Sequence, residues 1–151
     1  MPHGPSETTN KCVMKIRSIL ARGLIPLEEL DKTVGDYERL FDQPARLRFD
    51  YLEKDLRIAQ VGQLLIIGGN ETSLEPFRAI LMTFLVDDLN GYAAYLPSAG
   101  ASIIRSIQRV PSGRNMLVRQ VYGALVEYVE HNHPNPADET LAQDRNICSL
   151  P

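Results

Sequence analysis

The first half of the chain carries a hydrophobic pattern that predicts a strand, a helix and three more strands. Residues 20–27 are a short apolar run, which favours a strand. Apolar residues at helical spacing then predict one buried helix face: Leu30, Val34, Tyr37 and Phe41. At residues 47–51 apolar and charged residues alternate, as they do in a half-buried strand. Residues 56–61 and 64–67 predict two further strands around a turn at Gly62.

The second half repeats this order of elements. After a polar, turn-prone linker, residues 80–86 predict a strand and a short helix follows from Leu89. Pro97 is expected to stop or kink that helix, because proline removes a hydrogen-bond donor and clashes with the preceding turn. Three more apolar segments predict strands: residues 102–109, 115–121 and 124–130.

The two halves also match by offset, which indicates an internal duplication. Residues 27–30 and 86–89 share the order apolar, acidic, acidic, leucine, 59 residues apart. Gly62 and Gly123 correspond at an offset of 61, so the second copy contains two extra residues. A repeated unit affects the fold assignment more than any single motif does. The sequence therefore predicts an α+β protein made of two βαβββ modules.

These patterns divide the chain into five parts. In order, we predict a flexible N-terminal tail, the first module, a linker, the second module and a C-terminal appendage: residues 1–12, 13–69, 70–78, 79–132 and 133–151. The appendage has room for a short helix around residues 138–143.

Composition and charge exclude several classes of function. The 151 residues, of which 44% are hydrophobic, suffice for one core or for two modules that share one. The net charge of −3 without a basic stretch argues against a nucleic-acid partner. No apolar run approaches the roughly 20 residues that cross a bilayer, so we expect no membrane partner. Cys12 and Cys148 lack metal or redox spacing and fit free thiols in a reducing, cytoplasmic location.

Four segments carry a family resemblance: residues 84–89 (FLVDDL), 100–101 (GA), 110–115 (VPSGRN) and 123–130 (GALVEYVE). With the duplicated βαβββ order, they resemble the vicinal oxygen chelate superfamily of glyoxalases, bleomycin-resistance proteins and extradiol dioxygenases. The likeness spans roughly residues 20–131 and is more specific in the second module. It implies that the two modules form a curved mixed-sheet half-barrel around a cavity.

In that superfamily the cavity usually holds a divalent metal ion through His, Glu or Gln in the first and last strands of each module. The positions that correspond in this chain contain one such ligand: Glu127, Arg22, Leu81 and Ile66. A single carboxylate cannot hold a catalytic ion, and an arginine beside it would repel one. We therefore expect no metal and no other cofactor. Instead, Arg22 and Glu127 should face the cavity as an ion pair.

Five further residues are candidates for ligand binding, each with a structural alternative. Phe49 and Tyr51 share one strand face and would either stack on a planar ligand or pack under their module's helix. Arg114, Asn115 and Arg119 surround a flexible hairpin that borders the ligand mouth in the superfamily. Their alternative is a solvated loop.

His131 and His133 form an HxH pair that could hold a metal ion from one side of a strand. We interpret the pair as a solvated strand end, because it runs directly into Pro134.

The resemblance leaves three functions open. We favour a metal-independent, bleomycin-resistance-like protein that sequesters a small, partly apolar organic molecule. The second is an enzyme (lyase, isomerase, cyclase or dioxygenase) with Glu127 as the catalytic base or as a metal ligand. The third is a subunit or regulatory module whose cavity is filled by its own side chains.

Pro26 bears on assembly. Proline cannot donate to a sheet and suits the edge or the end of a strand. In bleomycin-resistance-like proteins a proline in the first strand accompanies arm exchange between two subunits. The resemblance therefore implies a homodimer in which each cavity is built from both chains.

Overall fold

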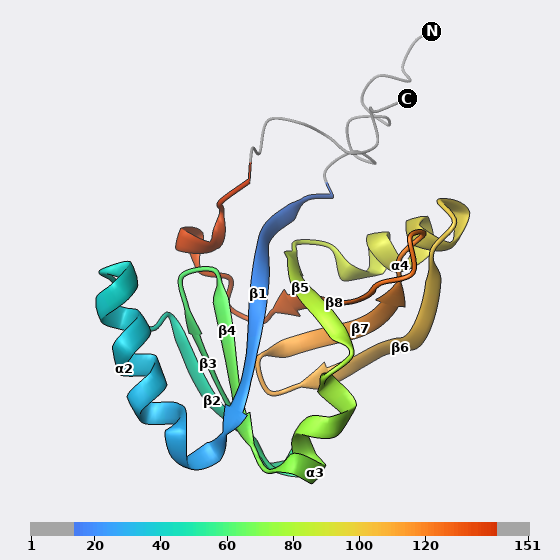
Figure 1. The fold of residues 1–151 in the computed structure, drawn as a ribbon. Coiled ribbons are helices and arrows are strands. Elements are labelled where there is room, and N and C mark those ends of the chain that lie inside the picture. The colour runs from blue at the N-terminus through green and yellow to red at the C-terminus, as the bar shows by residue number, and fades with distance from the viewer. Residues whose placement is uncertain (1–13, 142–151) are drawn as a thin grey trace, which may run out of the picture.

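A computed structural model describes residues 14–141 (Figure 1). The first module consists of β1 (Ile16–Pro26), α2 (Leu30–Phe41), β2 (Leu47–Tyr51), β3 (Leu56–Val61) and β4 (Leu64–Gly69). The second consists of β5 (Ile80–Val86), α4 (Leu89–Ser98), β6 (Ser102–Val110), β7 (Gly113–Arg119) and β8 (Leu125–His131). The predicted α+β fold of two βαβββ modules is confirmed.

One mixed sheet of eight strands joins the two modules, in the order β2-β3-β4-β1-β5-β8-β7-β6. At its centre β1 is parallel to β4 and antiparallel to β5, while β5 is parallel to β8. In Figure 1 the sheet curves, with α2 outside the strands of the first module and α4 outside those of the second. The inner face of this curve is therefore formed by strands of both modules.

Alternation along the strands creates core clusters on both faces of the sheet. Outside, α2 covers the first module with Leu30, Val34, Ala59, Val61 and Ile66, and α4 covers the second around Leu89, Tyr92 and Leu96. A third cluster faces inward and contains Leu20, Tyr51, Leu56, Leu65, Ile67, Leu74, Leu85 and Val129. The helices thus bury the outer face and leave the inner face to line an interior space.

The linker is more ordered than its polar sequence predicts. It contains a short helix, α3 (Glu71–Leu74), followed by a 3₁₀ turn, η3 (Glu75–Phe77). Asn70 caps α3, because its side chain accepts from the backbone N–H of Ser73 at 2.8 Å while Ser73 Oγ accepts from the N–H of Asn70 at 2.9 Å. This reciprocal cap satisfies two donors that a helix start leaves free.

Several predicted boundaries shift. Strand β1 begins at Ile16, four residues before the predicted strand, because Ile16 to Leu20 pair with β5. Pro97 lies in the last turn of α4, which ends one residue later. Instead of a helix around residues 138–143, the C-terminal segment has a 3₁₀ turn, η4 (Pro136–Asp138). The predicted tail and both cysteines lie outside the described residues.

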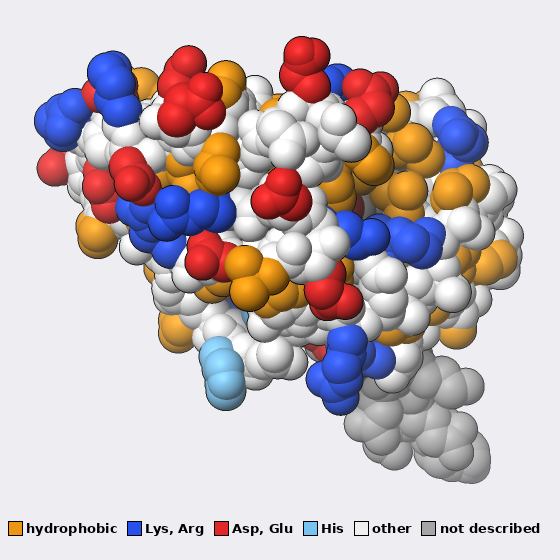
Figure 2. Space-filling model, turned by 90° about the horizontal axis from the view of Figure 1, so that it is seen from below, with side chains coloured by type: hydrophobic (Ala, Val, Ile, Leu, Met, Phe, Trp, Pro, Cys, Tyr) orange, Lys and Arg blue, Asp and Glu red, His pale blue; other side chains and the backbone are white. Residues whose placement is uncertain are grey.

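None of the helices within residues 14–141 is long and apolar enough to cross a membrane. The face seen in Figure 2 mixes acidic and basic side chains, with hydrophobic side chains exposed between them.

Candidate ligand-binding cavity

The inner face of the sheet encloses a cavity of about 270 Å³. This is close to the lower end of the ~300–1,000 Å³ that small-molecule sites occupy. Its walls are mainly apolar and include Leu20, Leu47, Phe49, Leu56, Ile58, Ile67, Phe77, Leu85, Leu117 and Val129. Lys54 and Pro76 also line it and are exposed, so the cavity reaches the surface beside η3.

An ion pair between Arg22 of β1 and Glu127 of β8 lies in this cavity. Arg22 Nη1 is 3.1 Å from Glu127 Oε1, and the two side chains are 2% and 11% exposed. Thr83 of β5 lies between them: its hydroxyl accepts from Arg22 Nη1 at 2.7 Å and donates to Glu127 Oε1 at 3.0 Å. The predicted pairing of Arg22 with Glu127 is confirmed.

Strand order explains why these residues meet. β5 is paired with β1 on one side and with β8 on the other, and Thr83 is the register partner of Glu127. In each strand the side chains alternate between the two faces. Arg22, Thr83 and Glu127 are the ones that point into the cavity.

The carboxylate of Glu127 has a further partner on its other oxygen. Asn115 Nδ2 of β7 donates to Glu127 Oε2 at 2.8 Å, and Asn115 Oδ1 accepts from Arg105 Nη1 of β6 at 3.0 Å. Asn115 is buried, with 5% exposure. A continuous polar row therefore crosses the cavity, with the guanidinium of Arg22 at one end and that of Arg105 at the other.

Burial shifts three titrating groups in the cavity. It lowers the pKa of Arg22 against the attraction of Glu127, although a guanidinium stays charged in proteins. Burial raises the pKa of Tyr51, and the negative charge of Glu53 adds to this effect. Burial lowers the pKa of His131, opposed mainly by Asp138, so the neutral imidazole is favoured.

The positions at which the family resemblance implies metal ligands do not fit a metal ion here. The register pairs are Arg22 with Leu65 and Thr83 with Glu127, so Leu65 and Thr83 face the cavity. Together these four positions offer the carboxylate of Glu127 and the hydroxyl of Thr83, beside the buried guanidinium of Arg22. Within residues 14–141 no group of three or more His, Cys, Asp or Glu could hold a metal ion.

This register corrects two predicted positions. Ile66 faces outward and is buried under α2, and Leu81 is 55% exposed. The register of β5 is irregular between Ile80 and Met82, which turns Leu81 outward. An offset read from the sequence could not reveal this irregularity.

The other predicted ligand-binding residues divide into two groups. Phe49, Tyr51 and Asn115 line the cavity, so the aromatic pair does not pack under α2. Arg114 and Arg119 are not among the lining residues. Arg114 precedes Asn115 in β7, so its side chain lies on the opposite face of the sheet, where its Nη2 donates to Glu130 at 2.6 Å. Arg119, exposed at the end of β7, donates to the carbonyl of Gly123 at 3.0 Å.

Polar cavity residues that were missed from the sequence include Thr83, Arg105 and His131. The interpretation of His131 as a solvated strand end is wrong, because its side chain lines the cavity. The signal was available, since His131 lies four residues after Glu127 on the same strand face. Thr83 was obscured by its apolar neighbours, and nothing in the residues around Arg105 distinguished it from a solvent-facing position.

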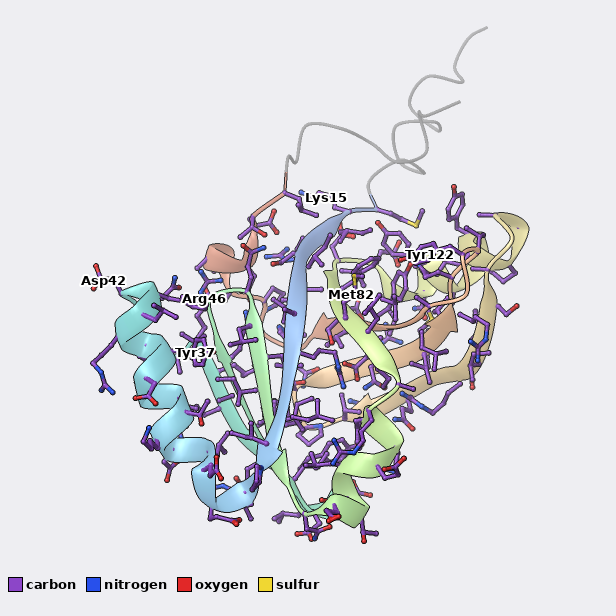
Figure 3. All side chains as sticks on the ribbon, in the orientation of Figure 1. Lys15, Tyr37, Asp42, Arg46, Met82 and Tyr122 are labelled. Carbon is purple, nitrogen blue, oxygen red and sulfur yellow. The ribbon has the colours of Figure 1, made fainter. Side chains whose placement is uncertain are left out.

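A second polar cluster closes the cavity behind Gln60, which is 1% exposed and lines it. Asp138 of η4 accepts from Gln60 Nε2 at 2.8 Å and from Arg46 Nη1 at 2.7 Å. Figure 3 shows Arg46 at the end of β2 that lies nearest η4. The C-terminal segment is therefore attached to the first module at this end of the cavity.

Comparison with solved structures agrees with this architecture. An uncharacterised protein from Methanosarcina mazei is 40% identical with a TM-score of 0.73, over 80% of this chain and 97% of that one. Methylmalonyl-CoA epimerase from Mycobacterium tuberculosis gives 0.61 at 14% identity, over 78% and 90% of the two chains. A hypothetical protein from Bacillus halodurans gives 0.58 at 12% identity, over 81% and 97%. No family model and no curated protein matches.

The fold is thus the glyoxalase-like fold of the vicinal oxygen chelate superfamily. Within it, the chain belongs to the same family as the uncharacterised Methanosarcina mazei protein.

Proposed function

We propose that the chain binds and sequesters a small, partly apolar organic molecule in this cavity without a metal ion. The observation that carries the proposal is the ion pair of Arg22 with Glu127 at the positions where related folds hold a metal. A fixed guanidinium there supplies positive charge and hydrogen-bond donors directly from the protein. Apolar walls such as Phe49, Leu85 and Val129 supply the burial that drives binding.

The size of the cavity favours binding over a purely structural module. Side chains that filled the interior would leave little space, whereas about 270 Å³ is open between the modules. Well-packed protein interiors contain few voids larger than a water molecule. A cavity of this size with mainly apolar walls is therefore typical of a ligand site.

An enzyme is the second candidate, because Glu127 and the neutral imidazole of His131 share one strand face in the cavity. The hydrogen bonds favour Glu127 as an anchor over a base. Both of its oxygens already accept hydrogen bonds, from Arg22, Thr83 and Asn115. These three donors fix the position of the carboxylate.

Native mass spectrometry of the purified protein tests the proposal. We expect a retained molecule in the wild type that is lost in Leu117→Trp, which fills the cavity from β7. The matched control is Leu81→Trp, which adds the same bulk on the outside of the sheet, where Leu81 is 55% exposed. A fragment library provides a second measurement, in which a compound that binds in the cavity raises the melting temperature of the wild type and leaves that of Leu117→Trp unchanged. The proposal is overturned if the wild type retains no molecule and no compound in the library behaves in this way.

Glu127→Gln separates sequestration from catalysis in the same measurement. Sequestration predicts that the variant retains the same molecule as the wild type. An enzyme in which Glu127 is the base predicts that the variant accumulates a different molecule, the unconverted substrate.

The homodimer and the cytoplasmic location stay predictions. The cavity does not need a second subunit to enclose it, because β1 pairs with β4 and β5 of its own chain and Pro26 ends that strand. Light scattering at micromolar concentration tests the dimer, and a monomer mass would contradict it.

A further inference from the structure

Arg22 leaves one edge of its guanidinium unused. Its Nη1 donates to Thr83 and Glu127, whereas Nε and Nη2 are buried and have no hydrogen-bond partner among the described residues. Nε–H and Nη2–H point in parallel from one edge, and their spacing matches the two oxygens of a carboxylate. Buried donors without a partner are costly, so they call for an acceptor.

The geometry of the ion pair shows that Glu127 does not use this edge. A pair built for stability alone would join the two-donor edge of Arg22 to both oxygens of Glu127. Here Glu127 receives one nitrogen of Arg22, and its second oxygen is held by Asn115. The two-donor edge is left for another acceptor.

Charge in the cavity favours an anionic acceptor. The charged lining residues are Arg22, Lys54, Arg105 and Glu127, a net charge of +2 in a chain whose net charge is −3. Arg22 pairs with Glu127, whereas Arg105 and Lys54 form no ion pair within residues 14–141. The face seen in Figure 2 carries side chains of both signs.

Arg105 is also held in place. It donates to Asn115, whose other side is fixed by Glu127, so the polar row presents a second guanidinium to the same space. An anion in the cavity would be attracted by both guanidinium groups, and the low dielectric of the apolar walls would strengthen that attraction.

We infer that the ligand is a small organic carboxylate, whose two oxygens accept from Nε and Nη2 of Arg22 while its apolar body packs against Phe49, Leu85 and Val129. Because this edge of Arg22 has almost no accessible surface in the structure, binding requires the guanidinium to turn the edge toward the cavity. This inference rests on the proposed function and specifies the chemical class of the molecule that the cavity takes. Arg105 acts as a second cation that raises affinity without forming the two-donor contact.

Matched acid and amide probes test this inference by titration calorimetry and ligand-observed NMR. Benzoate is compared with benzamide, and hexanoate with hexanamide, so that each pair differs in charge and hardly in shape. We expect both acids to bind the wild type at least tenfold more tightly than their amides. Arg22→Lys keeps the charge but lacks the planar fork, and it should weaken acid binding about 10- to 100-fold.

Two further variants keep the test independent of folding. Arg22→Met with Glu127→Met removes the buried pair as a unit, which proteins often tolerate, and it should abolish the preference for acids. Arg119→Gln removes a basic residue outside the cavity and should change neither affinity. Circular dichroism and thermal melting establish that each variant is folded.

Amides that bind as tightly as acids, or acid binding unchanged in Arg22→Lys, would overturn the inference and leave the proposed function standing. Failure of every acid to bind up to its solubility limit would also overturn it. A failure of the proposed function itself would be seen in different measurements, namely the native mass spectrum and the fragment screen that compares the wild type with Leu117→Trp.

Discussion

Arg22 Nη1 and Glu127 Oε1 lie 3.1 Å apart although 105 residues separate them in the chain. They come from the first strand of one module and the last strand of the other, with β5 between them. A link between these strands through a metal ion would need several donors. Here a guanidinium and a carboxylate make the link directly.

Breaking this pair should cost more than removing it. Arg22→Met or Glu127→Met alone leaves an uncompensated buried charge, and each should lower the free energy of unfolding by about 3–5 kcal/mol. The double variant should lose much less than the sum, because apolar side chains of similar volume then replace both charges. Urea unfolding of the four proteins measures the coupling. Additive losses would show that the two side chains do not depend on each other.

Metal binding should be absent in the wild type and attainable by design. Dialysis against zinc, nickel or manganese followed by elemental analysis should find no stoichiometric uptake. A triple variant, Arg22→His, Leu65→Glu and Thr83→His, would place four ligand side chains at the cavity positions defined by the register, with Glu127 as the fourth. It should bind zinc, and adding Glu127→Gln should weaken binding. Tight uptake by the wild type that Glu127→Gln abolishes would refute the metal-free site.

Much of the fold could be predicted from the sequence because its elements have strong periods. The alternation at residues 47–51 and the apolar run at 80–86 match β2 and β5 as observed. The first strand was harder, since Arg17 and Ser18 interrupt its apolar pattern while the backbone still pairs with β5. The linker helix was missed because Asn70 and Ser73 stabilise it by capping, in a segment with no apolar period.

The site was predictable only where strand alternation was regular. Glu127 and its cavity face follow from the pattern of β8, and Arg22 follows from the position of its strand relative to α2. Thr83 was not found, because the irregular register in β5 alters which of its residues face inward. Leu65 was not found, because the offset between Gly62 and Gly123 gives Ile66, one residue later, whereas the register partner of Arg22 is Leu65. Arg105 could not be found because β6 also has irregular pairing, between Ile103 and Gln108.

His131 should make stability depend on pH near neutrality. Burial lowers its folded pKa below the ordinary value of about 6.5, so the unfolded chain takes up a proton first as the pH falls. The contribution of the neutral imidazole is therefore fully present above about pH 6.5 and is lost as the pH falls toward the folded pKa. Asp138 and Glu127 reduce the shift, and Arg17 adds to it.

Urea unfolding of the wild type and of His131→Gln between pH 5 and 8 measures this contribution. The wild type should lose more stability than the variant as the pH falls through this range. His133→Gln is the control, because His133 is exposed. Equal slopes for the wild type and His131→Gln would contradict a buried neutral imidazole.

Asp138 should hold the C-terminal segment against the end of the cavity. It is 3% exposed and accepts hydrogen bonds from both Arg46 and Gln60. Asp138→Ala leaves these two donors without their acceptor, so the free energy of unfolding should fall by about 1–3 kcal/mol. Hydrogen exchange should also quicken at Ala137 and Thr140, because the segment would open more often than the rest of the chain.

Glu139→Ala is the matched control in the same segment. Glu139 pairs with Arg17 at 2.6 Å, and those side chains are 25% and 17% exposed, so its loss should cost less than the loss of Asp138. The comparison separates a buried anchor from a partly exposed ion pair one residue away. Should both variants cost the same and exchange at the same rate, Asp138 would not be what holds this segment to β2 and β3, and the cavity would be closed at this end by packing alone.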